Sequence, residues 1–180
     1  MAGWTTRDGK PSGWKAADGV MTVVPRTGDS VTEFVFGDAQ IHLEFMTPIE
    51  EGSGQDRGNS GVYIHGRYEV QVLDSYQSQT YPDGQCGAIY QQHVPRVNAC
   101  RPQGEWQSYD IIFRAPRFEN GKKVKNAVVT VIHNGVLIHD HAEVTPTGGA
   151  IGRDEMEKGP LLLQEHGHEV KYRNIWVRGL

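Results

Sequence analysis

The chain has 180 residues and a net charge of −4, from 22 acidic and 18 basic side chains. This length is most simply one domain, residues 1–180, with a sizeable core of its own. The charge provides no basic surface for nucleic acid, and no apolar run approaches the roughly 20 residues of a membrane helix. We therefore expect neither nucleic acid nor a membrane as a partner. The 22 Gly and 9 Pro, with many Val and Ile, favour a β-rich domain with frequent turns.

The cysteines and the N-terminus say little about cellular location. Cys86 and Cys100 are the only cysteines and lack CxxC spacing, which excludes a zinc site built from cysteines. One disulfide and two buried thiols are both compatible with this spacing, and we expect free thiols. The N-terminus has neither a basic region nor an apolar one, so no signal peptide is visible.

The first half of the chain reads as short strands separated by turns. Residues 21–24 and 31–36 are apolar runs of strand length, and residues 48–58 form a loop by composition. Residues 39–45 alternate cleanly between apolar and polar positions. The inward set is Ala39, Ile41, Leu43 and Phe45, and the outward set is Gln40, His42 and Glu44.

The most informative stretch is GNSGVYIHGRYEVQVLD, residues 58–74. Its opening Gly and Asn residues predict a tight turn that leads into a strand. In the strand at 68–72, the period of two places Glu69 and Gln71 together on the face opposite Tyr68. Asp74 is out of phase and joins that face only through a β-bulge or at the strand's end. Two acids and an amide gathered in this way orient a polyol and move protons. The plain alternative is a half-buried strand with a solvated polar face.

The second half of the chain contains one long irregular segment followed by more strands. Residues 75–101 lack periodicity, and ordered loops of that length are usually functional. Strands are predicted at 108–113, 128–138, 161–166 and 172–177, with a hairpin turn at Asn134-Gly135. The strand period places His139 and His141 on one face, where adventitious metal binding is possible.

These strands predict an antiparallel sandwich or barrel. Three strands combine an apolar face with an opposite face of hydrogen-bonding side chains. If they are neighbours in one sheet, their polar faces merge into a single patch suited to sugars. The three pairs are His42 with Glu44, Glu69 with Gln71, and Gln164 with His166.

The chain contains five long motifs: FGDAQIHLEF, GNSGVYIHGRYEVQVLDSY, YPDGQCGAIY, GEWQSYDIIFRAP and the closing GPLLLQEHG…VKYRNIWVRGL. Together these motifs resemble the bacterial 3-keto-disaccharide hydrolase family. The resemblance spans about Trp14 to Leu180. It implies a concanavalin-like jelly-roll β-sandwich of two antiparallel sheets with a concave polar face. It also implies substrates that are glycosides oxidised at C3, and it favours a bacterial periplasmic or secreted location.

The family's site residues carry over to matching positions. Glu69, Gln71 and Asp74 match its E-x-Q-x-x-D strand, Gln164 and His166 its L-Q-x-H, and Arg173-Asn174 its closing R-N-I. The implied catalytic residues are His166, Glu69 and Asp74. The same three side chains are candidate ligands of one divalent cation, and no organic cofactor is expected. The substrate-binding candidates are Gln71, Glu44, His42, Gln164, Asn59, Tyr63, Arg67, Trp106 and Arg173.

The implied chemistry is an elimination. A ketone at C3 acidifies the C2–H, a base removes that proton, and the enolate expels the oxygen substituent at C1. Adding water to the resulting enone gives net hydrolysis, so lyase and hydrolase outcomes both stay open. His166 is the natural base, because an imidazole ordinarily titrates near neutral pH. Glu69 and Asp74 then act as acid, hydrogen-bond anchors or cation ligands. The alternative for His166 is a purely structural histidine that is bonded to a backbone carbonyl. The alternative for Trp106, which could stack on a sugar ring, is a tryptophan packed in the core.

Two other functions are compatible with the same residues. A retaining glycosidase of the laminarinase type would use Glu69 and Asp74 with carboxyl groups about 5–5.5 Å apart. Against it, Gln71 occupies the intervening position, where that class of enzyme carries an acid. A lectin-like module would use the polar face without chemistry, and the fold alone does not separate these functions.

Overall fold

Short strands joined by turns make up the protein in a computed structural model that describes residues 1–180. The strands are β1 (Trp4–Thr5), β2 (Lys15–Ala17), β3 (Val20–Thr22), β4 (Ser30–Thr32), β5 (Ala39–Met46), β6 (Ser60–Ile64), β7 (Tyr68–Val72), β8 (Gln107–Arg114), β9 (Arg117–Glu119), β10 (Lys122–Lys125), β11 (Ala127–His133), β12 (Val136–Val144), β13 (Leu162–Leu163) and β14 (Lys171–Gly179). One 3-10 turn, η1, covers Pro82–Gly84. No helix has the length and apolar character needed to cross a bilayer.

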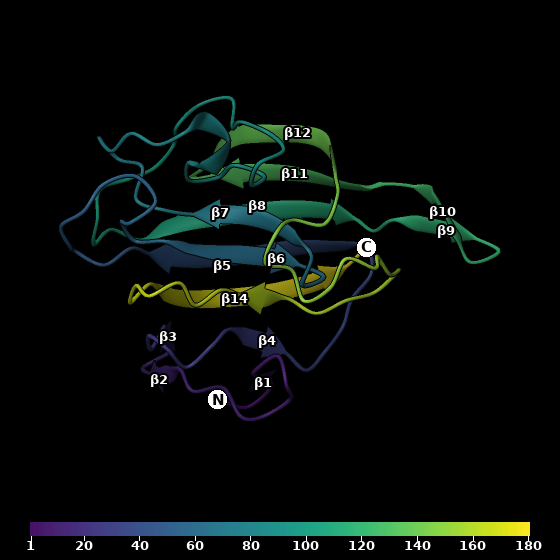
Figure 1. Cartoon of the computed structure of the whole chain (residues 1–180), viewed down its shortest axis with the longest axis horizontal. Helices are drawn as coiled ribbons and strands as arrows, with labels where there is room; N and C mark the ends of the chain where they lie inside the picture. Colours follow the sequence, from purple (N-terminus) through teal and green to yellow (C-terminus); the bar gives the residue numbers. More distant parts are fainter.

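Two antiparallel sheets stack face to face. The larger has seven strands in the order β12-β11-β8-β5-β14-β3-β2, and the smaller has five in the order β1-β4-β13-β6-β7. In Figure 1, β6 and β7 lie across the strands of the larger sheet, and the β9–β10 hairpin projects from the right-hand side. This arrangement confirms the predicted concanavalin-like jelly-roll sandwich.

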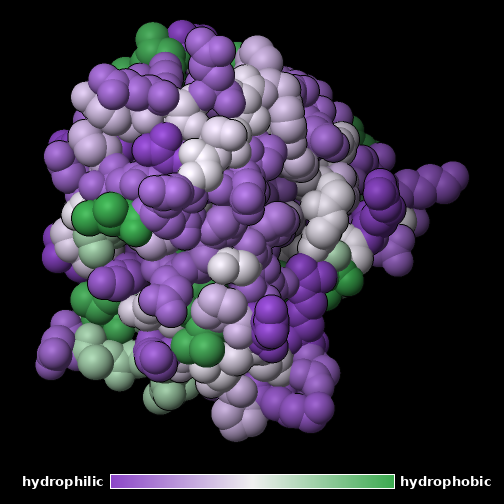
Figure 2. Space-filling model, turned by 60° about the vertical axis from the view of Figure 1, so that its left-hand side comes forward, coloured by the Kyte–Doolittle hydropathy of each residue, from purple (hydrophilic) through white to green (hydrophobic).

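The core lies between the sheets and follows the alternation of the sequence. Ala39, Ile41, Leu43 and Phe45 on β5 are fully buried, as predicted, and alternate with half-buried polar residues. They belong to one hydrophobic cluster that also takes in β6, β7, β8 and β11. Burial of this apolar surface is the main stabilising contribution. Hydrophilic residues cover most of the surface in Figure 2, and hydrophobic ones appear only singly or in small groups.

The β6–β7 hairpin is buried on both faces, which is unusual for a strand pair at a sheet edge. Its inner face contributes Val62 and Val70 to the core. On its outer face Tyr63 pairs with Glu69, and both are almost fully buried. Gly61 faces them, and a Cβ there would lie 2.6 Å from Glu69 Oε1. Only glycine therefore leaves room for the carboxyl group at this place.

The long segment at 75–101 contains no strand, in agreement with its lack of periodicity. Backbone hydrogen bonds tie it to β7: Gln71 N donates to Ala88 O, and Gly87 N donates to Gln71 O. Cys86 and Cys100 are buried free thiols, as expected. The segment is thus held against the edge of the smaller sheet, beside Glu69 and Gln71.

The prediction that His139 and His141 share a face is wrong. His139 is buried and its Nε2 lies 2.7 Å from Gly87 O, whereas His141 is exposed beside Asp140. The register between β11 and β12 shifts at this place, and His141 has a φ of 49°. A bulge of this kind interrupts the period of two on which the prediction depended.

Candidate active site

A hollow of about 300 Å³ on the outer face of the smaller sheet collects polar side chains from four parts of the chain. Such a volume is at the lower end of the usual range for small-molecule sites. Strand β7 and the residues after β13 form part of it, and irregular segments form the rest. The lining residues are Gln55, Asn59, Glu69, Gln71, Tyr90, Gly148, Gly149, Gln164 and His166. The structure thus brings together the predicted group of Glu69, Gln71, Gln164 and His166, with Asn59 beside it.

Glu69 is the buried acid of the hollow and is only 3% exposed. Burial raises the pKa of Glu69 to about 8, against an opposing effect of the Tyr63 hydroxyl, which donates a hydrogen bond to Glu69 Oε2 at 2.8 Å. Desolvation disfavours the charged form of a carboxyl group. Glu69 is therefore a neutral carboxylic acid at pH 7 and has a proton to donate.

Tyr63 lies behind Glu69 and fixes its orientation. Its hydroxyl also accepts a hydrogen bond from Gln164 Nε2 at 3.2 Å and lies 3.1 Å from Gly148 O. These contacts join β6, the segment after β13 and the wall at 148–149. Tyr63 is a support for the acid and does not itself line the hollow.

Gln71 presents an unused acceptor. Its Nε2 donates to Gln55 Oε1 at 3.1 Å and to Gly84 O at 3.2 Å, which identifies the nitrogen of the amide. Its Oε1 is buried and has no hydrogen-bond partner. Buried acceptors are rarely left unpaired. A hydroxyl group of a ligand in the hollow would satisfy this oxygen.

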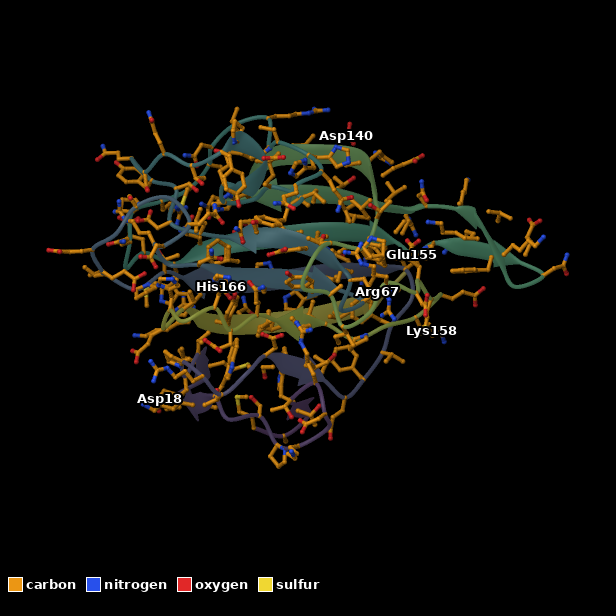
Figure 3. All side chains as sticks on the ribbon, in the orientation of Figure 1. Asp18, Arg67, Asp140, Glu155, Lys158 and His166 are labelled. Carbon is orange, nitrogen blue, oxygen red and sulfur yellow. The ribbon has the colours of Figure 1, made fainter.

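His166 stands at the rim, exposed to solvent, and its side chain makes no hydrogen bond or ion pair within the protein. In Figure 3 it lies to the left, well away from Arg67 and Glu155 on the right. An imidazole in this position is free to approach a bound ligand. Its location does not support a structural role.

Asp74 does not join the hollow, contrary to the predicted pairing with Glu69. It is fully buried two residues beyond the end of β7, and its Oδ2 lies 2.5 Å from Arg57 Nε. Tyr76 N donates to the other carboxylate oxygen at 3.0 Å. The phase of the strand already directed this side chain away from Glu69, and no bulge reverses it. Asp74 holds the loop at 47–58 against the sheet.

Replacing Asp74 with Asn is expected to lower the free energy of unfolding by about 2–4 kcal/mol, because it leaves the Arg57 charge without its partner. The partial exposure of Arg57 limits the loss. The measurement is the urea midpoint at pH 7, with Asp140→Asn as a control at an exposed ion pair. Equal midpoints for Asp74→Asn and the wild type would contradict this role.

Arg67, predicted to bind substrate, lies in the turn between β6 and β7 and does not line the hollow. Its guanidinium donates to the carbonyl oxygens of Asp154, at 2.5 Å, and His65, at 2.7 Å. Figure 3 places it next to Glu155 at the right-hand end of the sheets. Arg67 therefore anchors the segment that leads away from the hollow wall.

Four other predicted substrate-binding residues lie on the far side of the sandwich: His42, Glu44, Trp106 and Arg173. They belong to β5 and β14, or, for Trp106, directly precede β8, all in the seven-stranded sheet. Their side chains point away from the core, so the predicted single polar patch is wrong. The period of two assigns a face to each residue but does not say to which sheet its strand belongs. The aromatic ring in the hollow is Tyr90.

The predicted cation ligands are not assembled. Glu69 and His166 share the hollow, but the Asp74 carboxylate is occupied by Arg57. No group of three His, Cys, Asp or Glu side chains in the chain is arranged to hold a metal ion. The residues present therefore do not fit the proposed site, and we derive no catalytic step through a cation.

Sequence reasoning missed Gln55, Tyr90, Gly148 and Gly149, all in irregular segments. The length of the segment at 75–101 was a signal that it carries function, but nothing singled out Tyr90 within it. No sequence pattern pointed to Gln55, Gly148 or Gly149. Their contributions depend on contacts between segments distant in sequence.

A jelly-roll sandwich with a polar, hydrogen-bonding hollow on one sheet is suited to a carbohydrate ligand. Residues 1–178 match the family described as the 3-keto-alpha-glucoside-1,2-lyase-like domain. The chain belongs to this family. No curated protein matches the sequence.

Solved structures agree with this assignment. A crystal structure of a candidate glycosyl hydrolase from Parabacteroides distasonis is 41% identical, with a TM-score of 0.93, over 100% of this chain and 80% of that one. A carbohydrate-binding module from Bacillus subtilis has 12% identity and a TM-score of 0.55, over 99% and 97% of the two chains. An alginate lyase in complex with an alginate tetrasaccharide has 10% identity and a TM-score of 0.52, over 99% and 86%. The last two show the fold alone. Together, family and relatives identify a carbohydrate-active enzyme.

Proposed function

We propose that the protein cleaves the glycosidic bond of 3-keto-glycosides by elimination, with or without hydration of the product. The observation that carries the proposal is Glu69, a buried carboxylic acid that stays neutral at pH 7 on the floor of the hollow. A neutral acid donates a hydrogen bond to an oxygen that gains negative charge, which an ionised carboxylate does not. Elimination next to a ketone creates such an oxygen.

The residues have complementary roles in this reaction. His166 takes the proton from C2, and the electrons of the C–H bond move toward the C3 oxygen, where Glu69 donates a hydrogen bond to the enolate. The enolate collapses to the ketone, forms the C1=C2 bond and breaks the C1–O bond. The proton on His166 passes to the departing oxygen. Water added across the double bond then completes a net hydrolysis. Gln71 Oε1 accepts a sugar hydroxyl and so positions the ring.

The composition of the hollow favours a neutral sugar. Its lining contains no Lys or Arg, and its one acid is neutral at pH 7. The carboxylate of an anionic sugar would find no Lys or Arg side chain to pair with in this lining. Gln71 Oε1 is an unpaired acceptor, and Gln164 Nε2 has one N–H left beyond its bond to Tyr63, so the amides offer an acceptor and a donor to sugar hydroxyl groups.

The geometry argues against a retaining glycosidase. That mechanism needs two carboxyl groups about 5–5.5 Å apart on either side of the bond. Glu69 is the only carboxyl group in the lining, since Asp74 is buried in its ion pair with Arg57. A second acid is therefore missing from the site.

The test is to incubate the protein with 3-ketomaltose and, separately, with maltose, and to follow release of glucose by chromatography. We expect glucose from the keto sugar alone, because only the ketone acidifies the C2–H. Absorbance from an enone distinguishes elimination without hydration. Cleavage of both sugars at similar rates would overturn the elimination mechanism. Binding without cleavage of either would instead indicate a lectin-like module.

A further inference from the structure

The outer face of the seven-stranded sheet carries a ladder of polar side chains across its central strands β8, β5 and β14. His42 Nδ1 lies 2.7 Å from Asp110 Oδ1, and Asn174 Nδ2 lies 3.2 Å from His42 Nε2 and 3.1 Å from Glu44 Oε1. Arg173 Nε donates to Glu44 Oε2 at 2.6 Å. These contacts hold planar hydrogen-bonding groups in fixed orientations. The Arg173 guanidinium beside Glu44 also lowers the pKa of that carboxyl, so it stays ionised.

A tryptophan lies at each end of this ladder. The Trp176 ring stacks on His42, with centroids 5.3 Å apart and an interplanar angle of 17°, and Trp176 is 40% exposed. At the other end, the Arg173 guanidinium lies 3.9 Å from the centre of the half-buried Trp106 ring. Rings held by stacking lose little freedom when a ligand contacts them. The exposed surface of Trp176 gives an apolar platform next to the polar groups.

The ladder also borders a second hollow, of about 260 Å³, lined in part by Trp106, Arg173, Glu44, Ser108 and Arg101. The terminal nitrogens of Arg173 make no hydrogen bond within the protein, since only its Nε bonds Glu44. Ser108 Oγ likewise has no partner in the protein, although its backbone N–H is paired with Asn134. Donors and acceptors thus face the hollow without partners.

We propose that this face binds a glycan chain at a second site, separate from the hollow around Glu69. Sugar rings combine an apolar C–H face with a rim of hydroxyl groups. Trp176 offers a platform for the first, and Arg173, Asn174 and Glu44 offer donors and acceptors for the second. The ligand class follows from this combination, and the hydrophobic core between the sheets separates the two sites.

The site holds the enzyme near a polymeric or oligomeric glycan without taking part in cleavage. Two linked binding sites raise the effective concentration of substrate at the second one. The inference does not rest on the elimination mechanism, because it needs only binding of an unoxidised sugar chain. Its test can therefore fail or succeed independently of the proposed function.

The experiment is a titration of tryptophan fluorescence and, in parallel, calorimetry with maltohexaose and with cellohexaose. We expect one of these probes to bind, and Arg173→Met and Trp176→Ala each to weaken that binding about tenfold through loss of hydrogen bonds or of the ring contact. Tyr76→Ala, at an exposed aromatic residue elsewhere on the surface, is the matched control and should bind like the wild type. Gln71→Ala, in the hollow around Glu69, reports any binding that takes place there instead. Circular dichroism checks that every variant is folded.

Two results would overturn the proposal. The first is the absence of saturable binding of either hexasaccharide to the wild type by both methods. The second is binding that survives in both Arg173→Met and Trp176→Ala but weakens in Gln71→Ala, which would assign it to the hollow around Glu69. If one of the two variants does not fold, the other still decides, because each removes a different kind of contact.

Discussion

Replacing Glu69 with Gln is expected to lower kcat on a 3-keto-glycoside by about 10²–10⁴-fold, the usual contribution of a positioned acid or base. Gln keeps the shape of the side chain but offers a weaker hydrogen bond to the enolate oxygen. Because the contact strengthens as charge develops, the loss should appear in kcat more than in KM. Because the side chain at this position is only 3% exposed, water cannot enter to donate a hydrogen bond in place of the lost carboxylic acid.

The same substitution should make the folded protein more stable at alkaline pH. The unfolded carboxyl group ionises around its ordinary pKa of 4.5, whereas burial keeps the folded one protonated up to about pH 8. Between these values the folded state binds more protons, so this contribution to stability falls as the pH rises and is lost above about pH 8. Glu69→Gln lacks this pH dependence. At pH 9 it should therefore exceed the wild type by an amount on the order of a few kcal/mol.

Urea unfolding of both proteins at pH 5, 7 and 9, beside kcat on 3-ketomaltose, measures the two effects. Glu51→Gln, at an exposed carboxyl group in the loop after β5, is the control and should change neither. A Glu69→Gln protein with normal turnover, or one destabilised at pH 9, would contradict the role of a buried neutral acid.

Replacing His166 with Gln should cause a loss of about 10²–10⁴-fold in kcat with little change in KM or in stability. The side chain lies exposed at the rim of the hollow and makes no hydrogen bond or ion pair within the protein, so its loss should not disturb the fold. Gln retains hydrogen-bonding capacity but cannot take the proton from C2. Because His166 and Glu69 serve one transition state, the double variant should be far from additive.

Single-turnover rates for the two single variants and the double variant test this prediction. His141→Gln, at a histidine exposed on β12, is the matched control and should turn over normally. A His166→Gln enzyme with near-normal turnover, or a fully additive double variant, would show that the base lies elsewhere. His42 and Glu44 would not replace it, because they lie on the opposite sheet.

Local patterns in the sequence predicted much of the fold. Alternation on 39–45 assigned the buried face of β5, and Asn134-Gly135 marked the hairpin between β11 and β12. The shared phase of Glu69 and Gln71 placed both on the outer face of β7. The long motifs identified the family, which the match over residues 1–178 confirms. Each of these follows from side-chain direction along a few neighbouring residues, which sequence spacing determines.

Tertiary structure alone decided which polar residues meet. His42 and Glu44 have the same alternation as Glu69 and Gln71, yet pairing with β8 and β14 places them on the other sheet. Asp74 found its partner in Arg57, and Tyr90 entered the hollow from an irregular segment. Glu69 shares its hollow with Gly148 and Gly149, which lie far away in the sequence and which the Tyr63 hydroxyl links to the acid. The physical reason is that spacing sets the direction of a side chain, while strand pairing and loop packing over long sequence separations set its neighbours and its exposure to water.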